Sequence, residues 1–255
     1  MLESIHSFLG LEIRSVDTLI FIVLITIFGG IYRAYTGFGA GLVLVPAFSL
    51  LLQPVDAIIL VAILNQITML QLLPGSITNA PWKEVTTVTI ASIVTTPLGV
   101  YLLTVSDADL LKRGLGLLVV ASSLLLLSGW KYRGAESRLK DAAVGAMSGT
   151  LSGWTGMGGP PVILYFLSKD SISARTRAAF IVCFALTMIV ALLGYTVAGL
   201  MQLKYFVWAA ALLPIYGAAT WAGAILYGAT QHIEQIFRIA SLACLIVIGL
   251  ITMAS

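Results

Sequence analysis

The sequence predicts an all-α polytopic membrane protein made of two inverted repeats, each a re-entrant or broken hairpin of short helices followed by three transmembrane helices. Composition, the length of the apolar runs and a glycine-rich motif that occurs twice lead to this prediction. Of the 255 residues, 59% are hydrophobic and 10% are charged, and the mean hydropathy is +1.03. Because soluble domains carry about 25% charged residues, this composition indicates a membrane protein.

The apolar runs are separated by short polar turns, and most of them are long enough to cross a bilayer. A run that contains polar residues, 57–73, is interpreted as one further membrane helix. Four shorter runs pair around two glycine-rich breaks. The full spans are expected at 84–104, 110–129, 178–200, 205–227 and 236–253, and the short runs at 18–34, 41–52, 141–154 and 162–167.

The first break, from Tyr32 to Gly41, interrupts an apolar run with three glycines and an arginine. Unpaired backbone groups cost several kcal/mol each in lipid, so a break of this kind survives only inside protein or beside a wet cavity. The run after it would be about 18 Å long as a helix, which is too short for about 30 Å of hydrocarbon. The tip of this hairpin is therefore a candidate site.

A second break, 155–161, repeats the first. An offset of 119 residues lays Thr36 on Thr155 and Thr68 on Thr187. Basic loops mark the cytoplasmic side, which places the central loop inside and both chain termini outside. Each half then crosses an odd number of times, so the halves are inverted, as in secondary transporters. The predicted division is a lead-in 1–17, repeats 18–129 and 141–255, and a basic cytoplasmic linker 130–140.

Arg33 lies deep in an apolar segment just before the first break. An arginine at the bilayer centre costs about 2.5–3.5 kcal/mol on insertion scales. Each Asp and Glu lies in the lead-in, in a loop or at the first residue of a predicted run, so we interpret Arg33 as the cation of an anion-binding site. The alternative is an arginine whose long side chain extends to the membrane interface.

Both breaks are followed by a short helix whose first amides can bind an anion near the membrane midplane, because helix N-termini carry unpaired N–H groups and partial positive charge. Close-packing glycines of the GxxxG kind are the alternative. Asn65, Thr68 and Thr187 either line the path or hydrogen-bond between helices, and both interpretations stay open. The candidate substrate-binding residues are Arg33, Thr36, Gly37, Gly39, Ala40, Gly41, Asn65, Thr68, Thr155, Gly156, Gly158, Gly159 and Thr187.

Catalytic and metal-binding patterns do not occur in the predicted spans. His6 and His232 lie outside the spans, and Cys183 and Cys244 are isolated. Ser152 between a leucine and a glycine has no histidine within reach, which argues against a serine protease. The net charge of +3 resides in short loops. We therefore expect no enzyme activity, no metal, no cofactor and no nucleic-acid partner.

The two motifs resemble those of the TauE/SafE sulfite exporter family (TSUP) of membrane anion permeases. The likeness runs from Gly29 to Met253 and is carried by RAYTGFGAGLVLVP at 33–46 and GTLSGWTGMGGPP at 149–161. The first motif is similar to the branch with an arginine before the glycines. The resemblance implies transport of small sulfur-containing anions: sulfite, thiosulfate or organosulfonates.

From the residues and the resemblance together we expect a secondary transporter of the cell inner membrane, exporting the anion with the proton motive force and holding it between the two breaks and Arg33. The alternatives are a passive anion channel, an uptake permease for an organic sulfonate or carboxylate, and a membrane protein that transports nothing. The expected partners are the sulfur-containing anion and the lipid bilayer, with protons and further copies of the chain as additional candidates.

Overall fold

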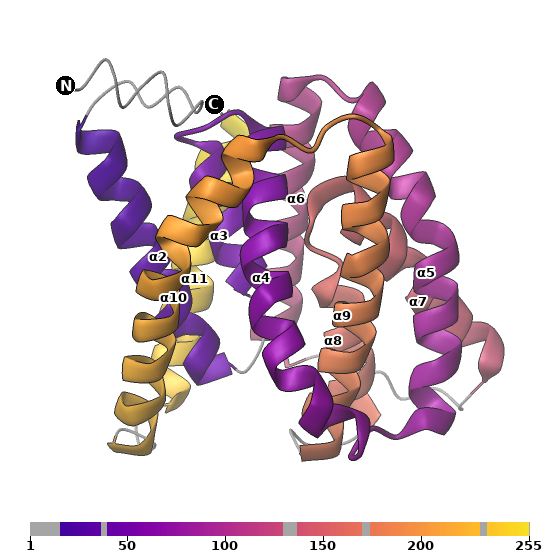
Figure 1. The fold of residues 1–255 in the computed structure, drawn as a ribbon. Coiled ribbons are helices and arrows are strands. Elements are labelled where there is room, and N and C mark those ends of the chain that lie inside the picture. Colours follow the sequence, from indigo (N-terminus) through magenta and orange to yellow (C-terminus); the bar gives the residue numbers. More distant parts are fainter. Residues whose placement is uncertain (1–15, 37–39, 130–136, 170–173, 230–233, 255) are drawn as a thin grey trace. The chain divides into compact units, whose positions relative to one another are not determined.

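Helices are the only regular secondary structure in the part of the chain that the computed structural model describes, residues 16–36, 40–129, 137–169, 174–229 and 234–254 (Figure 1). Six of these helices, α2, α4, α5, α6, α9 and α10, are long and apolar enough to cross a membrane. The predicted all-α polytopic class is confirmed. The helices are α2 Val16–Thr36, α3 Ala40–Ser49, α4 Pro54–Ile77, α5 Trp82–Val105, α6 Ala108–Leu127, α7 Arg138–Thr155, α8 Gly159–Lys169, α9 Ala174–Val197, α10 Leu203–Ala229 and α11 Glu234–Ala254.

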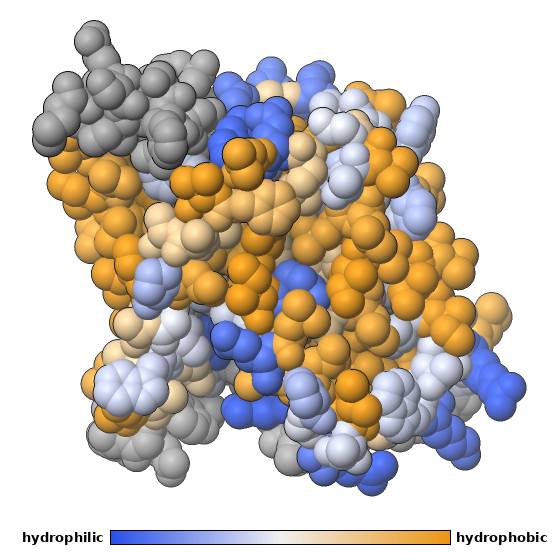
Figure 2. All heavy atoms as spheres, in the orientation of Figure 1, coloured by the Kyte–Doolittle hydropathy of each residue, from blue (hydrophilic) through white to orange (hydrophobic). Residues whose placement is uncertain are grey.

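Large apolar side chains point outward from several of these helices. Hydrophobic residues make up most of the surface visible in Figure 2. Val94 and Trp221 are each 70% exposed and Val197 is 90% exposed. Water-soluble proteins rarely display apolar surface of this extent, whereas lipid chains solvate it readily. The exposed apolar faces therefore fit helices that contact a bilayer.

Three helix boundaries differ from the sequence-based expectation. α2 has 21 residues and is itself a candidate span, so only α3, with ten residues, is a short arm of the first hairpin. α4 continues through Pro74, where we expected a loop, and the hydroxyl of Ser76 donates to the Leu72 carbonyl at 2.8 Å in this last turn. α7 begins at Arg138 and so takes in the end of the predicted linker.

The described residues fall into two compact units. One contains α2, α3, the first part of α4, most of α6, and α10 and α11; the other contains the rest of α4, α5, α7, α8 and α9. Each unit thus combines helices from both halves of the sequence. The division into repeats 18–129 and 141–255 stays a prediction. Repeats are defined by which helices resemble each other, whereas the compact units are defined by which helices are in contact.

In one unit, α5 and α7 approach each other backbone to backbone. A Cβ added to Gly149 would overlap the Ser92 carbonyl oxygen, and one added to Gly99 would overlap the Thr150 carbonyl oxygen. The Ser92 hydroxyl donates across the contact to the Gly145 carbonyl at 2.9 Å. Small residues and interhelical hydrogen bonds are the features that hold helices together in lipid, where burial of apolar surface gives little driving force.

In the other unit, α2 and α10 approach each other in the same way. A Cβ added to Gly30 would lie 2.9 Å from the Tyr216 carbonyl oxygen, and one added to Gly223 would lie 2.8 Å from the Ala34 Cβ. These distances are shorter than ordinary van der Waals contact, so glycine is needed at both positions for the helices to lie this close.

The two helix contacts correspond position by position, which supports the predicted repeat. The 119-residue offset aligns α2 with α7. α10 aligns with α5, because small residues and threonines follow one another in the same order in these two helices. In each pair a threonine of the second helix donates back to the carbonyl four residues earlier. The matched positions are Gly30 with Gly149, Ala34 with Gly153, Tyr216 with Ser92, Thr220 with Thr96 and Gly223 with Gly99.

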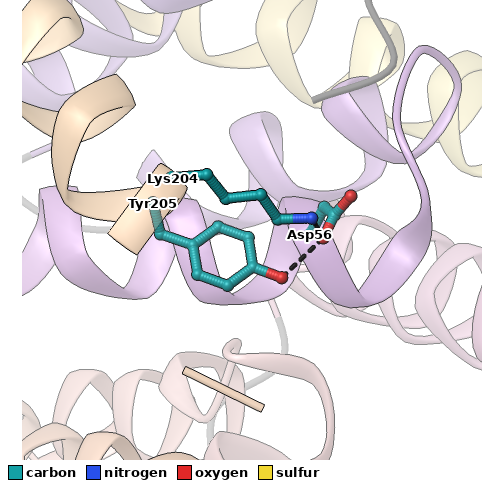
Figure 3. Close-up of polar contacts among 3 residues, drawn as sticks. All are labelled: Asp56, Lys204 and Tyr205. Atoms are coloured by element: carbon teal, nitrogen blue, oxygen red, sulfur yellow. Dashed lines mark hydrogen bonds and ion pairs between the residues drawn. The ribbon is translucent and has the colours of Figure 1, made fainter. Parts of the chain in front are cut away.

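The starts of α4 and α10 are joined by a polar cluster (Figure 3). Lys204 Nζ lies 3.1 Å from Asp56 Oδ1, and the Tyr205 hydroxyl donates to the same oxygen at 2.6 Å. Both helices therefore begin on the same side of their unit. The predicted topology requires this, since it places Asp56 and the start of α10 outside.

Candidate functional site

Arg33 lies in the last turn of α2, with only 6% of its surface exposed. Its Nη1 donates to the Tyr216 hydroxyl at 3.3 Å, and its guanidinium carbon lies 5.9 Å from the centroid of the Tyr216 ring. Tyr216 is fully buried. The close approach of α2 and α10 at Gly30 brings these two side chains together.

Two contacts describe where Arg33 lies along α10, Leu203–Ala229, which is a candidate span. Its guanidinium reaches Tyr216 in the middle of α10, while its chain neighbour Ala34 faces Gly223 in the last third of that helix. Helical side chains tilt toward the N-terminus of their helix, so the Arg33 side chain extends back along α2 from the last turn. Both interpretations of Arg33, the cation of an anion-binding site and extension to the membrane interface, stay predictions.

The first break is described only in part. Thr36 ends α2 and Ala40 begins α3, while Gly37, Gly39 and the side chain of Thr36 lie outside the described residues. α3 is buried along nearly all of its length. The first amides of a helix have no acceptor within it, so Ala40, Gly41 and the next two residues supply up to four N–H donors.

The second break is a turn held by backbone and side-chain hydrogen bonds. α7 ends at Thr155, and Gly156 follows with φ 68°, the left-handed conformation that favours glycine. The Gly156 N–H donates to the Ser152 carbonyl at 3.0 Å. The Ser148 hydroxyl donates to the Gly158 carbonyl at 2.6 Å. A Cβ at Gly158 would overlap the Ser152 hydroxyl, so the turn leaves no room for a larger residue.

Side chains also satisfy the carbonyl groups at the end of α7. Tyr195 of α9 is fully buried, and its hydroxyl shares one hydrogen bond between the Ser152 and Gly153 carbonyl oxygens, at 3.1 and 3.0 Å. The Thr155 hydroxyl donates to the Leu151 carbonyl at 2.8 Å. The N–H groups of Gly156 and Met157 already donate to the Ser152 carbonyl and the Thr155 hydroxyl, so the amides that the break can still offer to an anion are those of Gly158 and Gly159.

The first turn of α8 has fewer amide donors than the first turn of α3. α8 begins Gly159-Pro160-Pro161, and proline carries no N–H. Gly159 and Val162 are thus the remaining donors of its first four residues, whereas the first turn of α3 contains no proline. The first turns of α3 and α8 are therefore unequal as sources of N–H donors for an anion.

Contacts with α5 locate the second break along that helix. Thr150 and Gly153 of α7 contact Gly99, in the last third of α5. The Trp154 indole N–H donates to the hydroxyl of Ser106, just beyond the end of α5, at 3.1 Å. The break therefore lies past the middle of α5, as Ala34 beside Gly223 lies past the middle of α10, and the expected midplane position of both breaks stays a prediction.

The polar residues of α4 and α9 differ in their surroundings. The Thr68 hydroxyl donates to the Asn65 carbonyl within α4 at 2.9 Å, and both residues are partly exposed. Thr187 is 1% exposed, and its hydroxyl has no hydrogen-bond partner among the described residues. Gln66 on α4 is 5% exposed, and its side-chain amide donates to the Ala185 carbonyl of α9 at 3.3 Å.

Sequence reasoning did not find Tyr216, Tyr195 or Gln66. Tyr216 and Arg33 are 183 positions apart in the chain, and no local sequence pattern predicts their contact. Gln66 is different, because its partner Ala185 is 119 residues further along the chain. That separation equals the repeat offset, so positions related by the offset are a usable signal for contacts between equivalent helices.

These features define a polytopic α-helical membrane protein with broken helices and a buried cation, the arrangement of a membrane transporter. Residues 22–252 match the family described as sulfite exporter TauE/SafE, and the chain belongs to that family. It is 28% identical over 214 residues to the probable sulfite/organosulfonate exporter TauE of Cupriavidus necator, with 76% of this chain and 78% of that protein covered. No solved structure matches the chain at a significant level.

Proposed function

We propose that the chain is a secondary transporter that exports small sulfur-containing anions, namely sulfite, thiosulfate or organosulfonates, across the inner membrane with the proton motive force. The observation that carries this proposal is the buried Arg33 guanidinium held against Tyr216, midway along α10. A fixed cation at this depth is costly unless an anion or polar groups compensate it. Membership of the sulfite exporter family and the name of the relative support the choice of anion.

In this proposal Arg33 compensates the charge of the anion, and backbone amides bind its oxygens. The amides near Gly39–Gly41 provide most of the donors and those near Gly158–Gly159 fewer, because Pro160 and Pro161 leave the first turn of α8 without two of its N–H groups. Binding through backbone and one guanidinium recognises an oxyanion without a carboxylate or a metal. Lesser contacts are assigned to Thr36, Gly37, Asn65, Thr68, Thr155, Gly156 and Thr187, and alternating access comes from movement of one repeat against the other.

Purified protein in proteoliposomes tests the proposal through flux of radiolabelled sulfite, with and without a pH gradient. The wild type is expected to move sulfite faster when the gradient is imposed. Arg33→Ala is expected to lower the flux by about tenfold or more, because one hydrogen bond to a charged group contributes about 1.5–3 kcal/mol. Arg33→Lys keeps the charge but not the planar donor geometry, so it should recover only part of the flux.

Arg113 provides the matched control, because it is an exposed arginine near the start of α6. Arg113→Ala should leave the flux unchanged. Flux that follows voltage and ignores the pH gradient would identify a passive channel. Absence of flux with sulfite, thiosulfate and organosulfonates alike would contradict the transport of sulfur-containing anions.

A further inference from the structure

Gln66 is a buried polar residue that the proposed transport mechanism does not yet use. It lies at the middle of α4, and its partner Ala185 lies at the middle of α9. Only 5% of Gln66 is exposed. Its Nε2 donates to the Ala185 carbonyl oxygen at 3.3 Å, while its Oε1 is buried and has no hydrogen-bond partner among the described residues.

The contact with Ala185 fixes which way the amide of Gln66 faces. A backbone carbonyl only accepts hydrogen bonds, so the NH₂ group of the side chain must face it. The side-chain carbonyl is then directed elsewhere and can only accept. Gln66 therefore presents a fixed hydrogen-bond acceptor at the middle of two membrane helices.

An acceptor buried in this way is costly when nothing donates to it. The cost is greatest in a bilayer, where water does not reach most of the protein interior. A donor that binds to Oε1 removes this cost. The donor is either an ordered water or a ligand that carries a proton.

The chemistry of the proposed substrate selects between these donors. The sulfite dianion offers only acceptors, so it is repelled by the Gln66 carbonyl. Hydrogen sulfite carries one proton and can donate it in a hydrogen bond. The two forms interconvert near neutral pH, so both are present in the cell.

We propose that Gln66 is a specificity-determining contact that accepts a hydrogen bond from hydrogen sulfite, so that the monoprotonated anion is the species transported. This inference rests on the proposed export of sulfite. The proton crosses bound to the anion and is released when sulfite re-equilibrates in solution, so no protein group has to take it up. No bond is made or broken within the protein.

The titratable groups on α9 do not provide an alternative proton carrier beside Gln66. Cys183, two residues from Ala185, faces Thr89, Ser92 and Thr187. The hydroxyl of Tyr195 is engaged with the end of α7. The remaining ionisable side chains of α9 that the structure describes, Arg175 and Arg177, are exposed at its start. Four aspartates lie in the first turn of a helix, away from Gln66 in the middle of α4: Asp17 of α2, Asp56 of α4, Asp109 of α6 and Asp141 of α7.

The wild-type protein alone gives the first test. Initial sulfite flux from proteoliposomes is measured at constant total sulfite while the pH is varied equally on both sides. The flux is expected to follow the concentration of hydrogen sulfite and to fall as the pH rises. Flux that follows the dianion, rising with pH, would overturn the inference whatever the variants do.

The second test compares Gln66→Met with Gln71→Met, which changes an exposed glutamine of the same helix. Sulfate serves as a probe because it carries no proton near neutral pH. Wild type and Gln71→Met should prefer sulfite over sulfate, and Gln66→Met should lower that preference about tenfold, the effect of losing one hydrogen bond to an ion. An unchanged preference in folded Gln66→Met would mean that Oε1 only binds water.

The two proposals fail in different ways. If the proposed function is wrong, the wild type moves no sulfite at any pH. If only the inference about Gln66 is wrong, the wild type moves sulfite, but its pH profile or its preference over sulfate is independent of Gln66.

Discussion

Tyr216 holds Arg33 through two kinds of contact, a hydrogen bond from the guanidinium and the face of its ring. Tyr216→Phe removes the first and keeps the second. Because a hydrogen bond to a buried polar group contributes about 1 kcal/mol, we expect the KM for sulfite to rise several-fold while the maximal flux changes less. The measurement is concentration-dependent flux in proteoliposomes.

Tyr101 offers a control for this substitution, since its side chain is 62% exposed on α5. Tyr101→Phe should change neither KM nor maximal flux. A purely structural role of Tyr216 would lower the thermal midpoint of Tyr216→Phe without changing the KM of the protein that remains folded. That result would contradict the positioning of Arg33 by Tyr216.

For single residues, the sequence indicated which charged side chain is important but not which residues contact it in the fold. Arg33 stands out because a cation in an apolar run is costly wherever the chain folds. Tyr216 does not stand out, because an aromatic residue in a membrane helix is ordinary, and its importance arises only when α2 and α10 pack together. Residue type can thus reveal one member of a contact without revealing the other.

At the scale of helices, the contact between α5 and α7 depends on glycine. A methyl group at Gly149 would overlap a backbone oxygen of α5, so the helices must separate to accept it. Overpacking of this kind costs about 1–3 kcal/mol, and the separation also weakens the hydrogen bonds across the contact. We expect Gly149→Ala to lower the thermal midpoint of the detergent-purified protein.

Gly217 is the matched control, because it lies inside α10 with no atom within 4 Å of its added Cβ. Gly217→Ala should leave the midpoint unchanged or raise it, since alanine favours helix over glycine by up to about 1 kcal/mol. Equal destabilisation by both substitutions would show that helix packing at Gly149 is not the cause.

The helix order and both breaks could be predicted from the sequence, because apolar runs and glycine clusters are local properties. The end of α4 could not. Pro74 looked like the start of a loop, but a proline in the last helical turn loses only one backbone hydrogen bond, and α4 continues to Ile77. The contacts that locate the second break along α5 could not be predicted either, because they depend on how α7 packs against α5.

At the scale of the whole chain, the two sequence halves exchange helices. α5 packs against α7, and α10 packs against α2, so each compact unit contains members of both predicted repeats. Sequence similarity between halves indicates which helices are equivalent, but it says nothing about which helices touch. The exchange is a property of the tertiary structure, and it places Arg33 and Tyr216, from different halves, in one unit.

The predicted cytoplasmic position of the central linker can be tested by cysteine labelling from the outside of intact cells. In a background with Cys183→Ser and Cys244→Ser, we introduce Asp109→Cys or Arg138→Cys, both at exposed positions in the first turn of a helix. Charge in the loops predicts that Asp109 is outside and Arg138 is cytoplasmic. A membrane-impermeant maleimide should therefore react with the first variant directly and with the second only after permeabilisation. Reaction of both variants from outside would mean that an even number of crossings separates them, which would contradict the cytoplasmic position of the central linker.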